Sequence, residues 1–415
     1  HQANGGGYTH KNNSPCVTDK RREEIKSTLR LNYSMLQERD LIDEFSFNDD
    51  RSVFLWPLRA SEDYNGFSYY GISGFVDHNN NFPDQIQDYN CGSRSYDTMS
   101  GYNHSGTDIF TWPFTWNIME NDQVEVVASL DGIILGKDDG NYDQNCQNNE
   151  NLFWNAIYIL HSNGTVGWYG HLKKYSLTEK NIGDSVSQGE FLGVLGSSGN
   201  SNGPHLHFEV YGNTNQTILL DPYEGDCNTL NEQSWWIDQK PYYDSGINKL
   251  MTHSQVPDFN WNNCAELANI YEENFFRRNE NIYIAAYFRD QLPGQITEWS
   301  LIDPSGSIHN QWNQTFYYFY YSSYWYYYFP IDNNFAFGEW KINISYLGES
   351  YEHSFAIFDN YGDVNFDGFV NVLDLVVAVG FIINENYNRI LDMNFDDVLN
   401  VLDIVTLVDY IMVGE

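Results

Sequence analysis

Apolar residues in the middle of the chain alternate with polar ones over short runs, and glycine, asparagine and aspartate separate these runs. This two-residue period is typical of half-buried β-strands joined by turns. An Asn163-Gly164 pair favours a tight hairpin, because both residues tolerate positive φ angles. We therefore predict an antiparallel β-sheet with a groove between residues 51 and 225. Its clearest strands are expected at 124–136, 155–162, 165–172 and 189–195.

A second alternating region covers residues 263–358, with turn signals every dozen or so residues, and it predicts a small β-sandwich. Its segment 316–329 consists almost entirely of Tyr, Phe and Trp. Exposed rings there could stack on sugars or on an extended peptide. The simpler interpretation is two pleated strands with rings on both faces. The predicted strands are 282–288, 298–302, 316–329, 339–346 and 350–358.

The two ends of the chain predict helices. Residues 1–50 begin with a Gly- and Asn-rich run and continue with apolar residues at helical spacing, which predicts a helix around 19–43 that packs on the β-rich part. Near the other end, residues 362–383 and 391–412 are two copies of one unit, with eleven identities in 22 positions. Each copy ends in an apolar stripe at helical spacing.

Each C-terminal copy begins with oxygen-bearing residues at positions 1, 3, 5, 9 and 12 of a twelve-residue loop. This spacing matches an EF-hand-like calcium site, in which position 7 contributes a backbone carbonyl. The predicted calcium ligands are Asp363, Asn365, Asp367, Phe369, Asn371 and Asp374 in the first loop, and Asp392, Asn394, Asp396, Val398, Asn400 and Asp403 in the second.

The duplicated loop-helix unit resembles a type I dockerin. The resemblance implies docking onto a cohesin-like scaffold, and the alternative is a calcium-stapled cap on the sandwich. Gly368 stands at the sharp turn of the first loop, where the second loop has Asp397. Only glycine adopts such a turn without steric cost, so we expect weaker calcium binding in the second loop.

Composition narrows the possible partners. With 57 acidic and 21 basic residues the net charge is −36, which argues against nucleic acid and anionic membranes as partners. No stretch approaches the length of a membrane span. The chain opens on a polar run, and we interpret it as the mature form of a secreted or surface-attached protein whose export signal has been removed.

Five cysteines without a Cys-x-x-Cys pair make a thiolate zinc site improbable. In an exported protein they predict two disulfides and one remaining thiol. We favour the pairs Cys91–Cys146 and Cys227–Cys264, which leaves Cys16 over. Sequence alone does not fix this connectivity.

Histidine residues are the main candidates for metal ligands and catalytic groups. On one predicted strand His205, His207 and Glu209 share a face, because alternate side chains point the same way. A catalytic zinc typically keeps three protein ligands and leaves the fourth position to water. Upstream residues His104 and Asp108 complete such a set with His207. His205, together with His171, then remains to act on the water and the substrate.

These motifs resemble the lysostaphin/LytM-type zinc metallopeptidases over roughly residues 50–225. The resemblance rests on H-x-x-x-D ending at Asp108, on Tyr-Gly-His-Leu around His171, on H-x-H ending at His207, and on the glycine- and serine-rich loop before it. It implies zinc at His104, Asp108 and His207, with His171 and His205 sharing proton transfer. It also implies cleavage of peptidoglycan cross-bridges or glycine-rich proteins, since family members favour small residues at the scissile bond.

Three neighbouring residues have expected supporting roles. Glu209 is expected to orient one of the histidines, and Tyr96 or Tyr102 to add a hydroxyl donor. In this family an N-terminal segment can cover the groove, which is the alternative role for residues 1–50. The rival function is a non-catalytic peptidoglycan- or partner-binding module, anchored through the dockerin-like tail.

The expected chain is thus mainly β, with a peptidase sheet, a β-sandwich and a terminal calcium-binding pair. The expected divisions are 1–50, an N-terminal extension; 51–225, the peptidase domain; 226–262, a connector; 263–358, the sandwich; and 361–415, the dockerin-like domain.

Overall fold

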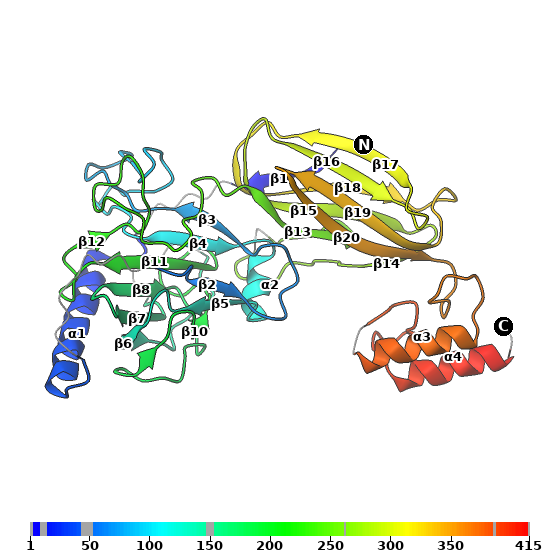
Figure 1. Ribbon diagram of the computed structural model, residues 1–415, viewed down its shortest axis with the longest axis horizontal. Coiled ribbons are helices and arrows are strands. Elements are labelled where there is room, and N and C mark those ends of the chain that lie inside the picture. The colour runs from blue at the N-terminus through cyan, green and yellow to red at the C-terminus, as the bar shows by residue number, and fades with distance from the viewer. Residues whose placement is uncertain are drawn as a thin grey trace.

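The computed structural model describes residues 3–8, 15–42, 53–146, 153–260, 263–384 and 387–413. Figure 1 shows two β-rich bodies side by side, with a long helix flanking one of them and a pair of helices beyond the other. The mainly β, antiparallel fold predicted from the alternation is confirmed. None of the described helices is long and apolar enough to cross a bilayer.

The first body is built on an eight-stranded sheet in the order β3-β4-β11-β8-β7-β6-β9, with β12 beside β11. A three-stranded sheet, β10-β5-β2, packs against it. The predicted hairpin joins β7 to β8, and Gly164 in its turn has a φ of +86°. The strands are β2 (Leu58–Ala60), β3 (Tyr70–Gly74), β4 (Thr107–Thr111), β5 (Val124–Val127), β6 (Gly132–Asp138), β7 (Ala156–His161), β8 (Val166–Gly170), β9 (Ser185–Val186), β10 (Phe191–Val194), β11 (His205–Tyr211) and β12 (Leu219–Leu220), with the short helix α2 (Thr115–Glu120) after β4.

Strand β11 is buried along its whole length. Leu206, Phe208 and Val210 belong to the core between the two sheets, as the alternation predicts. The opposite face of the sheet carries a second apolar cluster, which includes Trp168 and residues of the N-terminal helix. Both faces of β11 are therefore covered, and its polar side chains lie in an enclosed space.

The predicted N-terminal helix is α1 (Asp19–Glu38), and the Thr18 side chain caps it by accepting from the Arg21 amide. The helix ends before residue 43, which lies outside the described residues. Leu29 packs where a side chain at Gly136 would otherwise project, and Asn32 donates to the carbonyl of Leu135 at 2.9 Å. The helix is therefore fitted to the sheet surface at β6.

The second body is the predicted sandwich. Its sheets run β1-β18-β15-β13 and β14-β20-β19-β16-β17, and an apolar core lies between them. The strands are β1 (Asn4–Tyr8), β13 (Gly246–His253), β14 (Phe275–Arg277), β15 (Asn281–Gln291), β16 (Ile296–Ile302), β17 (Ile308–Thr315), β18 (Tyr320–Pro330), β19 (Gly338–Tyr346) and β20 (Glu349–Phe358).

Three details differ from the expectations. Strand β13 lies within 226–262, the expected connector, because it pairs with β15 and extends the sandwich sheet. Strand β1 comes from the Gly- and Asn-rich start of the chain and pairs with β18. The aromatic run contributes one strand, β18, rather than two, because residues 316–319 connect β17 to β18 and only the part from Tyr320 onward pairs with β15.

The predicted disulfide pairing is wrong. The bonds are Cys91–Cys227 and Cys146–Cys264, and Cys16 is free and buried. The chain that follows the peptidase sheet turns back, so that the amide of Cys227 donates to the carbonyl of Tyr89, two residues before Cys91. The second bond closes a loop of 118 residues between the peptidase part and the segment leading to the sandwich.

A buried ion pair joins the two bodies. Arg94, in the peptidase part, lies 3.0 Å from Asp290 on β15, and both side chains are almost fully enclosed. The same guanidinium donates to the carbonyls of Ile72 and Tyr242. The contact is therefore hydrogen-bonded on several sides, as a buried pair requires.

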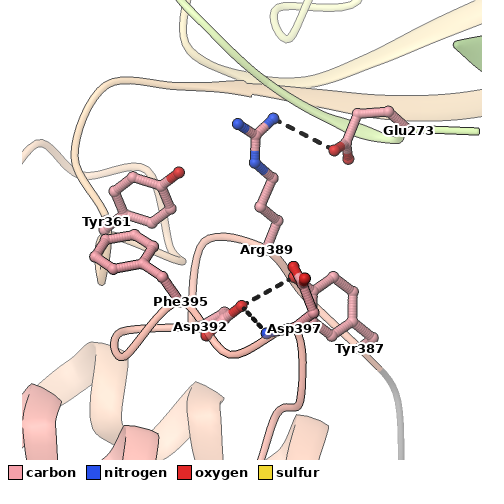
Figure 2. Close-up of a pocket in the computed structure, with 7 residues that line it drawn as sticks. All are labelled: Glu273, Tyr361, Tyr387, Arg389, Asp392, Phe395 and Asp397. Atoms are coloured by element: carbon pink, nitrogen blue, oxygen red, sulfur yellow. Dashed lines mark hydrogen bonds and ion pairs between the residues drawn. The ribbon is translucent and has the colours of Figure 1, made fainter. Parts of the chain in front are cut away.

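The C-terminal helices are α3 (Val372–Ile383) and α4 (Val401–Val413). Arg389, between them, bonds to Glu273 and Glu280 of the sandwich part at 3.3 and 2.9 Å. A cavity of about 390 Å³ lies at this junction, and Figure 2 shows the side chains that line it. Its wall consists of Glu273, Tyr361, Tyr387, Arg389, Asp392, Phe395 and Asp397.

Candidate metal centre

Strand pairing brings the predicted zinc ligands together. Strands β4 and β11 are antiparallel neighbours, and Asp108 lies directly opposite His207 in their register. His104 precedes β4 in a loop and is held there by backbone bonds to Tyr96 and Asp77. All three side chains are buried.

The three ligand atoms form a compact triangle. Asp108 Oδ1 lies 3.1 Å from His104 Nε2 and 2.8 Å from His207 Nδ1, and the two nitrogens are 3.3 Å apart. Ligands bound to zinc at about 2.0–2.1 Å in a tetrahedron are about 3.3 Å from one another. Two imidazoles and a carboxylate at this spacing fit a zinc ion.

The remaining nitrogens of the two ligand histidines are also bonded. His104 Nδ1 lies 2.7 Å from the carbonyl of Phe75, and His207 Nε2 lies 3.0 Å from Glu209 Oε2. Such partners fix the ring orientation and the tautomer of a metal ligand. The expected position of Glu209 beside a histidine is therefore what the structure has. Glu209 in turn accepts from Ser105 at 2.9 Å.

The two other histidines line the same space. His171 Nδ1 lies 2.6 Å from the carbonyl of Ser198, and His205 Nδ1 lies 2.8 Å from that of Gly203. Their ring centroids are 4.3 Å apart. The Nε2 atoms of both rings are buried and have no hydrogen-bond partner. Because a buried polar atom without a partner is costly, these two atoms indicate a space that a ligand fills.

The local charges are strongly coupled. Burial opposes ionisation of Asp108, but the adjacent imidazoles of His104 and His207 hold its pKa well below the ordinary value. Burial would also raise the pKa of Glu209, yet the Arg22 guanidinium and His207 lower it to about 2. Burial and the neighbouring His205 lower the pKa of His171. The Glu209 carboxylate beside the ligand triangle is therefore ionised, and the nearby imidazole of His171 is neutral.

Both tyrosines expected near the site are present. Tyr96 stacks on His104 with ring centroids 4.4 Å apart, and its hydroxyl lies 2.8 Å from the Sγ of Cys16. The hydroxyl of Tyr102 is buried and has no hydrogen-bond partner. The sequence predicted that one of these tyrosines adds a hydroxyl donor, and it did not specify the partner of that hydroxyl.

Two residues of the N-terminal segment were missed by sequence reasoning. Cys16 Sγ lies within 4.8 Å of the ligand atoms of the triangle, and also of those of His171 and His205. Arg22 bonds to Glu209, to Tyr211 at 2.8 Å and to Ser105 at 2.9 Å. In the sequence, Cys16 was distinguished only as the cysteine left over after two disulfides. No sequence feature indicated that Arg22 lies near the site.

The two C-terminal loops repeat the same hydrogen bonds. Asp363 accepts from the amides of Asp367 and Gly368 at 3.1 and 3.0 Å, and Asp392 accepts from the matching amides at 3.2 and 3.0 Å. Gly368 has a φ of +86°, and Asp397 has one of +60°. The expected unfavourable conformation of Asp397 is thus present.

The predicted apolar stripes of α3 and α4 are largely exposed. Ala378 and Leu407 are buried between the helices. The larger part of both stripes lies in solvent, namely Val372, Leu373, Val376, Val379, Ile383, Val401, Leu402, Val405, Met412 and Val413.

Residues 103–219 match the model of peptidase family M23. This segment contains all five histidine and aspartate residues of the candidate centre. The chain is 39% identical over 85 residues, 20% of its length, to the DD-carboxypeptidase/endopeptidase Mpg of Neisseria meningitidis serogroup B. It is 34% identical over 97 residues, 23% of its length, to the peptidoglycan DD-endopeptidase ShyC of Vibrio cholerae.

A third relative is the glycyl-glycine endopeptidase ALE-1 of Staphylococcus capitis, with 32% identity over 112 residues, 27% of this chain. The matched segments span 16%, 21% and 25% of Mpg, ShyC and ALE-1. The similarity therefore concerns the peptidase part alone. Within this longer, mainly β chain, residues 103–219 are thus a segment similar to peptidase family M23.

Proposed function

We propose that this chain is a secreted zinc metalloendopeptidase that hydrolyses peptide bonds in peptidoglycan cross-bridges or in glycine-rich proteins. The observation that carries the proposal is the buried triangle of His104, Asp108 and His207, faced by two further imidazoles. The relatives named as a peptidoglycan DD-endopeptidase and a glycyl-glycine endopeptidase support the substrate class. Two disulfides support secretion, because such bonds persist in oxidising compartments.

The ligand triangle would hold the zinc. When bound, zinc activates water as a nucleophile and polarises the scissile carbonyl as a Lewis acid. Glu209 keeps the imidazole of His207 in one orientation, and the Phe75 carbonyl does the same for His104. The chain thereby positions the ligand atoms before the metal binds.

His171 and His205 would move the protons. Because each Nδ1 faces a backbone carbonyl, Nε2 is the atom left to exchange a proton with the reactants. His171 has a lowered pKa and is suited to accept the proton of the attacking water. His205 is suited to donate a hydrogen bond to the developing oxyanion. The accepted proton is then delivered to the leaving amine.

The experiment measures zinc content and cleavage together. Purified full-length chain should contain one zinc and cleave purified peptidoglycan or a polyglycine peptide, and His207→Ala should lose both properties. The alternative is a non-catalytic peptidoglycan- or partner-binding module. Zinc-independent binding of peptidoglycan without cleavage, in the parent chain and in Cys16→Ala alike, would support that alternative and contradict the peptidase.

We further propose that the C-terminal loops each bind calcium and that α3 and α4 dock onto a cohesin-like scaffold. The repeated carboxylate geometry of Asp363 and Asp392 supports the calcium sites. The exposed apolar residues along both helices support a docking surface. Docking would attach the secreted enzyme to a larger assembly or to a cell surface.

A further inference from the structure

The one cysteine outside the disulfides lies at the candidate metal centre. Cys16 Sγ is within 4.8 Å of the three proposed zinc-ligand atoms and, separately, of the ligand atoms of His171 and His205. The two groups share only this sulfur. Cys16 therefore supplies the one ligand atom that the triangle and the pair of imidazoles have in common.

A second observation indicates that a ligand belongs at this point. The Nε2 atoms of His171 and His205 are buried and lack hydrogen-bond partners, while their Nδ1 atoms are tied to backbone carbonyls. Each of these rings also has a ligand atom within 4.8 Å of the Cys16 sulfur. A metal ion bound by Cys16 and the triangle would place charge beside these nitrogens.

The chain on either side of Cys16 is fixed to the peptidase domain. The carbonyl of Pro15 accepts a hydrogen bond from the side chain of Asn200, in the loop that leads to β11. Val17 is buried in the cluster beneath α1. On the helix, Arg22 bonds to Glu209, which itself contacts a zinc ligand. The sulfur is therefore held in place by contacts on both sides.

We propose that Cys16 is a fourth protein ligand of the zinc and that residues 15–38 hold the peptidase in a latent form. This inference rests on the proposed function. Thiolate sulfur binds zinc at about 2.3 Å beside histidine and aspartate ligands, and four protein ligands characterise a closed site. While Cys16 is bound, the open position of a catalytic zinc does not exist. Release of α1 from β6 and β11 removes the sulfur and opens the site.

The ligand claim is tested spectroscopically on the full chain loaded with cobalt(II), compared with Cys16→Ala. Because the other four cysteines are in disulfides, a sulfur-to-cobalt charge-transfer band has one possible source. We expect the band in the parent chain and in Lys20→Ala, a control at an exposed position of the same segment, and its loss in Cys16→Ala at unchanged metal content. Bound cobalt without the band in the parent chain overturns the ligand claim.

Latency is tested by cleavage of purified peptidoglycan and a polyglycine peptide. Cys16→Ala should cleave about tenfold faster than the parent or more, which corresponds to about one open molecule in ten or fewer. Lys20→Ala, at an exposed position, should stay close to the parent rate. A parent chain that cleaves as fast as Cys16→Ala overturns latency. Absence of cleavage by both contradicts the proposed function, while the cobalt band still decides whether Cys16 is a ligand.

Discussion

Arg22 on α1 and Glu209 on β11 form an ion pair in which the carboxylate is fully buried and the guanidinium is 11% exposed. The pair links the N-terminal helix to the metal centre, because Glu209 also contacts His207. It is the strongest polar contact between α1 and the strand that carries the H-x-H motif. Removal of the Arg22 side chain leaves the buried Glu209 carboxylate without its cation.

Arg22→Met should loosen α1 while keeping the aliphatic part of the side chain in place. Breaking a buried pair from one side costs about 3–5 kcal/mol. Amide hydrogen exchange within Asp19–Glu38 should therefore become faster. Arg30→Met on the same helix is the control, because Arg30 is more exposed and its loss should cost no more than about 1 kcal/mol. Equal acceleration in both variants would contradict the anchoring role of Arg22.

Asp108→Ala should lower zinc content and activity together, because it removes the ligand that lies between the two imidazoles. Elemental analysis after gel filtration measures the metal, and peptide cleavage measures the activity. Asp122→Ala is the matched control, since this exposed carboxylate pairs only with Lys173 at the surface. A variant at Asp108 that retains full zinc would show that the ligand set is misassigned.

His171→Ala and His205→Ala should retain zinc but lose about 10²–10⁴-fold in turnover, the usual contribution of proton transfer. His309→Ala, at an exposed position in the sandwich, should change neither quantity. The comparison with His207→Ala is decisive. If the bound zinc content of either variant falls as far as that of His207→Ala, the mutated histidine is a zinc ligand rather than a proton carrier.

Calcium removal should expose the C-terminal loops to proteolysis and leave the peptidase domain folded, because metal binding appears directly as stability of the segment it orders. Limited proteolysis of the full chain, with and without a chelator, measures this difference. Asp397→Gly should strengthen the second site by about 5- to 30-fold, since it relieves a left-handed conformation costing about 1–2 kcal/mol. Titration calorimetry measures the affinity, and an unchanged value would show that the aspartate carries no penalty.

His161 should make the stability of the peptidase domain depend on pH. Burial lowers its pKa from 6.5 to about 3, so the folded state keeps it neutral while the unfolded chain binds a proton below pH 6.5. Its contribution is therefore complete above pH 6.5 and declines as the pH falls toward 3, by about 2 kcal/mol at pH 5. Denaturant unfolding at pH 7 and pH 5 measures this slope. The loss of unfolding free energy between pH 7 and pH 5 should be smaller in His161→Gln than in the parent chain. In His309→Gln it should equal the loss in the parent chain.

The common face of His205, His207 and Glu209 was predictable because strand alternation decides which side chains point the same way. The pattern from His205 to Val210 separates polar from apolar residues, and the structure keeps that separation. His104 and Asp108 were assigned to the same site through the H-x-x-x-D motif and its family resemblance, because alternation within one strand does not specify the neighbouring strand. The alternation of polar and apolar residues was sufficient to predict features that depend on a single strand.

Contacts between distant segments were not predictable in this way. The partner of Cys91 is 136 residues away, and spacing alone favoured a nearer cysteine. Cys16 reaches the metal centre through the docking of α1, and docking depends on shape and buried charge rather than on period. Strand β1 was overlooked because its glycines carry no side-chain pattern, although its backbone pairs with β18.

The buried pair of Arg94 and Asp290 has a mechanical consequence. Separating the two β-rich bodies would expose both charges or leave them unpaired, so the ion pair opposes their separation.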